Sequence, residues 1–541
     1  MRLIKSQIKL IVTVFSFLIL FASFSNAQIR FQKVYGGTAL DWSNCVIQTT
    51  DSNFLMMCSS VNFGSGLEDV YLIKTNQSGD TLWTRTYGGS TNDEEGYIVQ
   101  QTLDGGFILS GTTESFGAGG SDIFLIKTDA LGGVTWSTTY GGANVDFCTG
   151  AQECFDGGYI ISGYTTSFGA GGGTTDLFLI KTDIWGDTSW TKTFGSSGIE
   201  YGYNAKQTAD SGFVIVGSTN VNGPTDVYLI KTDVNGNIVW TRTYGGASDD
   251  VGFAILTLQD GYCIAGSTMS FGAGGMDAYL IKTDLNGDTL WSKTYGTSDS
   301  DACLSIKQTA DAGFIMTGFA NKHNGTFDDV LIIKTDSAGN MEWSKVVGGT
   351  SSARDVGRCA IPTYDGGYLI SGFTQSFGGG TEIILIKTDL IGISGCNTFN
   401  ATINTTSPAT SVGTFAPQES HGGTITFPVF LTGTGTCNMT ILCMPAGIQN
   451  PDGNNNSLTF YPNPFSASVQ VKLNEVLHNR ELIFVLVDMM GREMSRTIIN
   501  GNNITDGNSF TFERGNLLPG MYMFHLIDAS NVIGSGKLVA E

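Results

Sequence analysis

Apolar and polar residues alternate in short runs along this chain, and no long stretch after residue 27 shows the apolar period of a helix. Within residues 95–142 the runs GYIVQQT, FILSGTT, DIFLIKT and VTWSTTYGG are separated by the glycine-rich segments LDGG, ESFGAGGS and DALGG. The third run is apolar on both faces, as expected of a strand covered on both sides. LDGG favours a hairpin because its residues tolerate positive φ. The pattern therefore predicts four antiparallel strands.

This unit recurs along the chain. The tripeptide IKT occurs seven times, at intervals of 50 to 54 residues, and a tryptophan follows nine residues after each of the first six lysines. The lysines are Lys74, Lys127, Lys181, Lys231, Lys282, Lys334 and Lys387, and the tryptophans are Trp83, Trp136, Trp190, Trp240, Trp291 and Trp343. Four antiparallel strands repeated at this period are typical of the blades of a β-propeller.

The two ends of the repeat array complement each other. IRFQKVYGG (29–37) resembles the end of a unit such as TLWTRTYGG (81–89), and Phe31 lies 52 residues before Trp83. The seventh unit has three strands, and Cys396 stands where its tryptophan is expected. Pairing the two ends would leave no exposed sheet edge between them. The sequence predicts an all-β fold, a seven-bladed propeller over residues 28–390 that is closed by its N-terminal strand.

Residues 1–27 have the features of a secretory signal peptide. Arg2, Lys5 and Lys9 precede an apolar run, and small residues lie before Gln28, which predicts cleavage after Ala27. A membrane anchor is the alternative, but the run is short for a span of about 20 residues. We therefore expect export.

The net charge and the small number of histidines disfavour several classes of function. The net charge is −21, and it becomes −24 without residues 1–27, which carry three basic and no acidic residues. Such a chain repels phosphate backbones, so we expect no nucleic-acid partner. Only four histidines occur, which disfavours a histidine metal cluster or a Ser-His-Asp triad. No cofactor is expected. Calcium stays a weak alternative because turns such as DVNGN (233–237) lack the spacing and the glutamate of a calcium loop.

Two sets of side chains suggest cross-links within the propeller. The IKT lysines are expected on the same face as the aspartates of the DGG hairpins, which predicts repeated ion pairs. Cys45 and Cys58 flank the DSN turn almost symmetrically, which makes them a candidate disulfide in an exported protein. Two of the cysteines at 396, 437 and 443 are a further candidate pair.

The SFGAGG loops and the crossovers after YGG are predicted to share one face, and their length and variability favour that face for binding. The repeat is interrupted at 218–226 and 319–329, where a unique site would lie. The structural alternative is that the phenylalanines fill gaps between blades and the aspartates cap turns. The candidate binding residues are Phe116, Asp122, Phe168, Asp176, Phe271, Asp277, His323 and Asp328.

Three functional hypotheses follow. The first is a non-catalytic binding or adhesion protein with an extracellular glycan or protein ligand, since the units are nearly uniform and no catalytic cluster stands out. The second is a secreted carbohydrate-active enzyme, and the third is a structural protein of a surface layer. KTDLNGDTLW (282–291) also resembles the blade motif of quinoprotein dehydrogenases, with one residue fewer between Asp and Gly, but no quinone site is identifiable.

A Ser/Thr/Gly-rich segment and linker (391–456) precede residues 457–541, which resemble the type A sorting domain of the type IX secretion system. The resemblance implies a small β-sandwich that delivers the protein through the periplasm to the cell surface or the medium. It also implies contact with the secretion machinery and attachment to surface lipopolysaccharide as one possible fate. The motif residues are Tyr461, Pro462, Asn463, Pro464, Asp488, Gly491, Pro519, Gly520, Tyr522, Gly536 and Lys537.

Overall fold

The structure is a computed structural model, and its chain divides into two compact units, Met1–Pro445 and Ala446–Glu541. The predicted signal peptide (1–27) lies outside the described residues. None of the described residues forms a helix long and apolar enough to cross a membrane. The structure describes residues 28–90, 93–169, 175–321, 328–349, 353–395, 397–401, 403–413, 418–420, 424–426, 431–433, 438–443, 459–461, 467–472, 482–488, 493–499, 504–505, 509–515, 517, 520–528 and 531–540.

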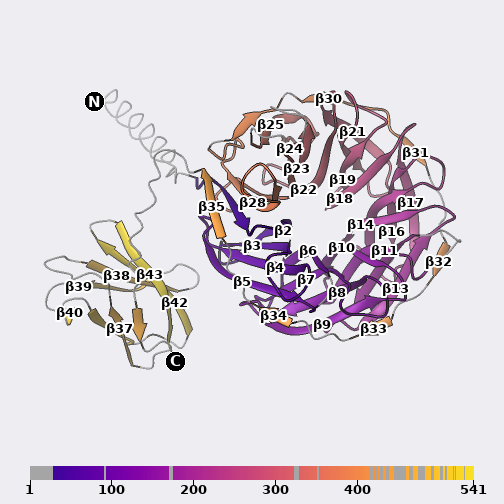
Figure 1. The fold of residues 1–541 in the computed structure, drawn as a ribbon. Helices are drawn as coiled ribbons and strands as arrows, with labels where there is room; N and C mark the ends of the chain where they lie inside the picture. The colour runs from indigo at the N-terminus through magenta and orange to yellow at the C-terminus, as the bar shows by residue number, and fades with distance from the viewer. Residues whose placement is uncertain are drawn as a thin grey trace, which may run out of the picture. The chain divides into compact units, whose positions relative to one another are not determined.

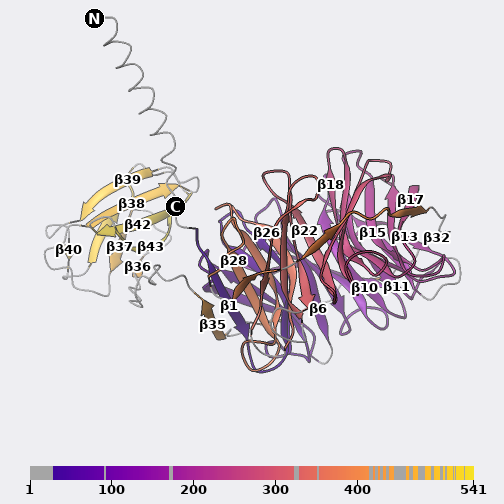
Figure 2. The same cartoon turned by 90° about the horizontal axis from the view of Figure 1, so that it is seen from above.

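The first unit is a ring of seven antiparallel sheets around a central channel (Figure 1; Figure 2 shows it from above). Each sheet, or blade, runs outward from a first strand at the channel to a fourth strand at the rim. The first strands of blades 1 to 7 are β2 (Asp41–Gln48), β6 (Glu94–Gln101), β10 (Asp146–Glu153), β14 (Glu200–Gln207), β18 (Asp250–Leu258), β22 (Asp301–Gln308) and β26 (Asp355–Pro362). The second strands are β3 (Phe54–Ser60), β7 (Phe107–Thr113), β11 (Tyr159–Thr165), β15 (Phe213–Thr219), β19 (Gly261–Thr268), β23 (Phe314–Asn321) and β27 (Tyr368–Thr374).

The third strands carry the IKT sequence and are buried almost throughout, because a neighbouring blade covers each face. They are β4 (Asp69–Thr75), β8 (Asp122–Thr128), β12 (Asp176–Thr182), β16 (Asp226–Thr232), β20 (Asp277–Thr283), β24 (Asp328–Thr335) and β28 (Glu382–Thr388). The fourth strands are β5 (Thr81–Gly88), β9 (Val134–Gly141), β13 (Thr188–Gly195), β17 (Ile238–Gly245), β21 (Thr289–Gly296) and β25 (Met341–Val347), with β1 (Phe31–Gly36) in blade 7.

The N-terminal strand closes the ring, as predicted. β1 pairs antiparallel with β28, and Phe31 lies opposite Lys387 just as Trp83 lies opposite Lys74 in blade 1. Lys33 also reaches the next blade, where its Nζ lies 2.6 Å from an oxygen of Asp80. The first and seventh blades are therefore joined by the register that the sequence indicated.

The predicted ion pairs are present in all seven blades and lie within a blade, between the third strand and the first hairpin. Each lysine is nearly buried, whereas its aspartate is largely accessible, so the pair covers one end of the blade. The pairs are Lys74–Asp51, Lys127–Asp104, Lys181–Asp156, Lys231–Asp210, Lys282–Asp260, Lys334–Asp311 and Lys387–Asp365.

Tyrosine and tryptophan side chains of the fourth strands join neighbouring blades. The Tyr87 hydroxyl donates a hydrogen bond of 2.7 Å to the carbonyl oxygen of Gly132 in the next blade. Trp83 packs against the same turn, where Gly132 has a φ of 80° and a methyl group would lie 3.3 Å from the indole. Glycine fits this turn because it takes positive φ and leaves room for the ring.

The segment after the seventh blade adds a fifth strand to every blade and encircles the ring (Figure 1). It passes the blades in the order 6, 5, 4, 3, 2, 1 and 7, so each outer edge gains a strand partner. The strands are β29 (Thr398–Asn400), β30 (Asn404–Thr406), β31 (Ser411–Gly413), β32 (Gln418–Ser420), β33 (Thr424–Thr426), β34 (Leu431–Gly433) and β35 (Asn438–Cys443). We call these seven strands the belt.

The second unit has two four-stranded sheets. They pack through an apolar core in which the Phe484 ring lies 5.4 Å from Phe510 of the other sheet. One sheet contains β36 (Thr459–Tyr461), β37 (Ser468–Lys472), β41 (Ser509–Glu513) and β40 (Ile504–Thr505). The other contains β39 (Glu493–Ile499), β38 (Leu482–Asp488), β42 (Gly520–Asp528) and β43 (Asn531–Ala540).

The structure does not form the candidate disulfide between Cys45 and Cys58. A bulge in β2 shifts the register, so that Cys45 lies opposite Met57 and Cys58 opposite Ser43. The symmetric spacing around the turn did not reveal this bulge. Cys396 and Cys437 lie outside the described residues.

Candidate functional site: the central channel

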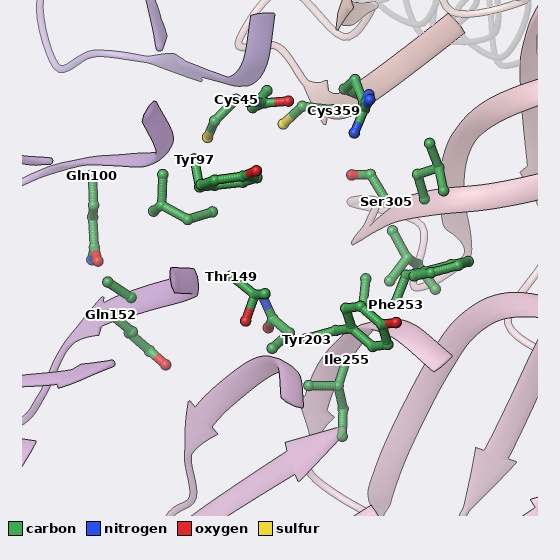
Figure 3. Close-up of a pocket in the computed structure, with 18 of the residues that line it drawn as sticks. Cys45, Tyr97, Gln100, Thr149, Gln152, Tyr203, Phe253, Ile255, Ser305 and Cys359 are labelled. Carbon is green, nitrogen blue, oxygen red and sulfur yellow. The ribbon is translucent and has the colours of Figure 1, made fainter. Parts of the chain in front are cut away.

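The first strands of all seven blades line a cavity of about 950 Å³ at the ring axis (Figure 3). A cavity of this size with a mostly apolar lining and a few polar groups is typical of a ligand site. Each first strand contributes three or four residues to this wall. The channel therefore brings together residues that lie far apart in the chain.

Six aromatic side chains form a continuous arc on one side of the channel. The arc begins with Tyr97 of blade 2, whose ring centroid lies 5.2 Å from that of Phe147. Phe147 stacks on Tyr164 at 4.9 Å, and Tyr164 meets Tyr201 at 4.9 Å. The arc continues through Tyr203, which lies 5.2 Å from Phe253 of blade 5. These rings are only partly buried and offer their faces and edges to the cavity.

The charged side chains that line the cavity are all basic. They are Lys206, Lys307 and Arg358, and no Asp or Glu is among the lining residues, although acidic residues outnumber basic ones 49 to 28 in the chain. Burial, and then the charge of the nearby Lys307, lower the pKa of Lys206 to about 7. The cavity wall therefore carries positive charge and no carboxylate of its own.

Arg358 lies on the side of the channel that the arc leaves open. Its guanidinium lies 5.8 Å from the centre of the Phe373 ring. Burial lowers its pKa, while the hydroxyl of Tyr97 and the carboxylate of Glu95 raise it. Glu95 itself accepts a hydrogen bond of 3.3 Å from the Trp42 indole. Arg358 is thus available to a ligand that enters the cavity.

The predicted binding residues lie elsewhere, in the loops of the predicted face. Asp122 and Asp277 are almost fully buried, and each accepts hydrogen bonds from two backbone amides of its own SFGAGG loop. Asp176 is buried as well. These contacts match the alternative in which the aspartates cap turns.

The three phenylalanines pack inward. Phe116 lies against the core of blades 1 and 2, Phe168 contacts Phe178 at 5.9 Å, and Phe271 contacts Tyr279 at 6.0 Å. Asp328 forms an ion pair of 2.8 Å with Arg354, and His323 lies outside the described residues. None of the described candidates lines the channel. Among the residues with described positions, no three His, Cys, Asp or Glu side chains converge as metal ligands.

The sequence did not predict the channel residues, because the candidates were chosen from the loops and from the places where a loop departs from the repeat. The third strands of the seven units are nearly identical, from DVYLIKT to DAYLIKT, whereas the fourth position of the first strand varies widely. That position is Asn44, Tyr97, Thr149, Tyr203, Phe253, Leu304 and Arg358 in blades 1 to 7. Variation within a uniform repeat was the signal that could have located the site.

The second unit carries part of the sorting motif. Tyr522 is buried in β42 beside Gly520, Tyr461 ends β36, Asp488 ends β38, and Gly536 and Lys537 lie in β43. The motif positions at 462–464, 491 and 519 lie outside the described residues.

A family model described as the secretion system C-terminal sorting domain matches residues 459–541. This part of the chain is a sorting domain of the type IX secretion system. It indicates export to the cell surface or the medium, and it implies contact with the type IX machinery. The prediction from the motif residues is confirmed.

Two solved structures are similar to this chain at low sequence identity. No curated protein matches the chain. A fungal alcohol oxidase of the AA5 family in complex with copper is similar at 10% identity, with 95% of this chain and 99% of that chain covered and a TM-score of 0.37. Sqt1 from Chaetomium thermophilum is similar at 12% identity, with 73% and 90% covered and a TM-score of 0.38. Nothing about the chemistry of this chain follows from either.

Proposed function

We propose that this chain is an exported binding protein whose central channel takes up an acidic carbohydrate. The observation that carries the proposal is the composition of the channel wall: six aromatic rings and three basic side chains without an acidic one. Sugar rings have apolar faces that pack on aromatic side chains. A uronic carboxylate or a sulfate ester would accept charge-assisted hydrogen bonds from Lys206, Lys307 and Arg358.

A binding role without turnover is favoured over hydrolysis. Most glycoside hydrolases need two carboxylates, one on each side of the scissile bond. The channel wall offers none. Export by the sorting domain places the channel where extracellular polysaccharides occur, which agrees with adhesion or glycan capture.

The test compares purified residues 28–541 on an acidic polysaccharide, polygalacturonate, and on neutral dextran, by isothermal titration calorimetry. We expect Lys206→Met to weaken binding of the acidic glycan about tenfold, because it removes one charge-assisted hydrogen bond. Lys293→Met is the matched control, since Lys293 lies on the outer strand β21 and bonds Ser407 there. Equal affinity for both glycans, or equal effects of the two substitutions, would contradict the proposal.

The affinity should also depend on pH. The pKa of Lys206 is about 7 in the free channel, so the side chain loses its proton as the pH rises through 7. A bound anion favours the protonated form, and affinity therefore falls from pH 6 to pH 8. Titrations at these two pH values check this, and Lys206→Met should show a smaller change.

A second candidate is a lyase that eliminates across the glycosidic bond of a uronic acid. One observation favours it: a lysine with a pKa near neutrality can act as a general base. Lys206 would remove the proton next to the carboxylate, and a second cation would neutralise the carboxylate. Ultraviolet absorbance of the unsaturated product detects this activity. Its appearance, and its loss in Lys206→Met, would replace the non-catalytic proposal by this one.

A further inference from the structure

Blades 1 and 7 are neighbours in the ring although they lie at opposite ends of the repeat array. Strands β2 and β26 run side by side at this seam, where the Ser43 hydroxyl donates to the Ser371 hydroxyl at 3.1 Å. The backbone amide of Tyr364 also donates to Gln48 at 2.8 Å. These bonds and the pairing of β1 with β28 are non-covalent, so the seam is the place where the ring can open.

Two cysteines occupy equivalent positions on the two sides of this seam. Cys45 is the fifth residue of β2 and Cys359 is the fifth residue of β26. In the other five first strands this position is Ile98, Gly150, Asn204, Ala254 or Ser305. Thus cysteine occurs at this position only in the two blades that meet at the seam.

The two cysteines lie next to each other (Figure 3). Cys359 Sγ donates a hydrogen bond of 3.6 Å to the carbonyl oxygen of Val46, the residue after Cys45, and each cysteine shifts the pKa of the other. Both side chains line the channel (Figure 3). Their exposed fractions are 7% and 8%. A small oxidant that enters the channel can therefore reach them.

Their surroundings activate one of the two. The neighbouring Cys45, the positive charge of Lys307 and the Ser305 side chain lower the pKa of Cys359, against the effect of burial. The pKa of Cys45 is raised, first by the contact with Cys359 and then by burial. Cys359 is thus the thiol that loses its proton more readily and attacks first, and Cys45 is the resolving thiol.

We propose that Cys45 and Cys359 form a disulfide after export, and that this bond locks the first blade to the last. The oxidant is a disulfide of the oxidising compartment. Cys359 attacks one of its sulfurs, which releases the first thiol and leaves a mixed disulfide on Cys359. Cys45 then loses its proton and attacks Cys359 Sγ, which releases the second thiol. Two protein thiols are oxidised, and one external disulfide is reduced to two thiols.

The bond would close a loop that contains almost the entire propeller. A cross-link between residues so far apart strongly restricts the unfolded chain, and it holds the seam even when β1 detaches. The pairing of β1 sets the register of the ring, and the disulfide would then make closure permanent. This role is independent of any ligand in the channel.

The experiment uses the mature full chain purified from the medium or the cell surface after thiols are blocked with iodoacetamide. Mass spectrometry of peptides digested without reductant should show the peptide of Cys45 linked to that of Cys359. On a non-reducing denaturing gel, the exported protein should migrate faster than the reduced protein, because the loop compacts it. Reductant should also lower the melting temperature by several degrees.

Variants separate this bond from other effects. Cys359→Ser and Cys45→Ser should each abolish the mobility shift and the effect of reductant on melting. Cys303→Ser is the matched control, because Cys303 is a buried, free cysteine of a first strand away from the seam. If a seam variant does not fold, the peptide analysis of the unmodified protein decides. Carbamidomethylated Cys45 and Cys359 in the exported protein, or a link from either to another cysteine, would overturn the proposal.

Discussion

At the scale of single residues, tyrosine hydroxyls join successive blades. Tyr35, Tyr87, Tyr140, Tyr244 and Tyr295 each donate a hydrogen bond to a glycine carbonyl in the next blade. Blade 3 has Phe194 at this position, and the equivalent glycine of the next turn is Gly236, with the same positive φ as Gly287. The junction after blade 3, which lacks the hydroxyl, can therefore be compared with the junctions that have it.

We expect Tyr244→Phe to reduce the free energy of unfolding by about 1 kcal/mol, since it removes a buried hydrogen bond to Gly287 and changes little else. Phe194→Tyr, which places a hydroxyl near Gly236, should increase it by up to a similar amount. Urea unfolding of both variants at constant pH measures the difference. A destabilised Phe194→Tyr would mean that the third junction lacks room for the oxygen.

The residue pattern predicted the blades and their register better than it predicted the residues that line the channel. The register of Phe31, the tryptophans and the IKT lysines repeats along the chain, because every blade needs the same packing. The residues that line the channel meet no such requirement. Tyr203, Phe253 and Arg358 occupy one structural position and differ freely, so only the variation at that position within an otherwise uniform repeat marks them. Their convergence is a property of the closed ring, which a linear pattern does not show.

At the scale of elements, β1 was predictable and the belt was not. β1 copies a fourth strand, including the YGG ending. The belt strands are mostly three residues long, too short for an alternating apolar pattern, and they begin six or seven residues apart at 398, 404, 411, 418, 424, 431 and 438. Seven evenly spaced short strands match seven blades. The segment looked like a linker because each strand contributes edge pairing rather than a core.

Removing the belt should destabilise the ring, because it exposes the backbone donors and acceptors of seven outer strands. Deletion of residues 397–541 is compared with deletion of 457–541, which removes only the sorting domain. We expect the shorter deletion to leave the melting temperature of the propeller unchanged, and the longer one to lower it and to promote aggregation in light scattering. Equal melting of the two truncated proteins would show that the belt adds no stability.

At the scale of the whole molecule, the two units have separate tasks. The sorting domain directs export, and the proposed ligand site lies in the channel of the propeller. Deleting residues 457–541 should therefore leave a folded propeller in the periplasm. Immunoblots of periplasm, surface and medium fractions check this, with the full chain as control. Arrival of the truncated protein outside the cell would contradict the assigned role of the domain.

The stability of the whole ring should depend on pH in two separate windows. Burial raises the pKa values of Asp122 and Asp301 to about 6, and the neighbouring carboxylates of Asp146 and Asp277 add to the effect. A carboxyl with a raised pKa in the folded state stabilises the fold below its unfolded pKa, and this contribution is lost as the pH rises through 6. The ring should therefore be more stable at pH 5 than at pH 7.5.

The ion pairs act in the opposite sense and at lower pH. Although burial opposes it, hydrogen bonds from Lys127 and Thr102 lower the pKa of Asp104 to about 2, so its contribution is lost only as the pH falls from 4 to 2. Differential scanning calorimetry from pH 4.5 to 7.5 isolates the first window. Asp301→Asn should reduce the difference between pH 5 and pH 7.5 by an amount of order 1 kcal/mol, whereas Asp104→Asn should leave it unchanged. If the melting temperature of the unmodified protein rises from pH 5 to pH 7.5, the buried carboxyl groups are not protonated in the folded ring.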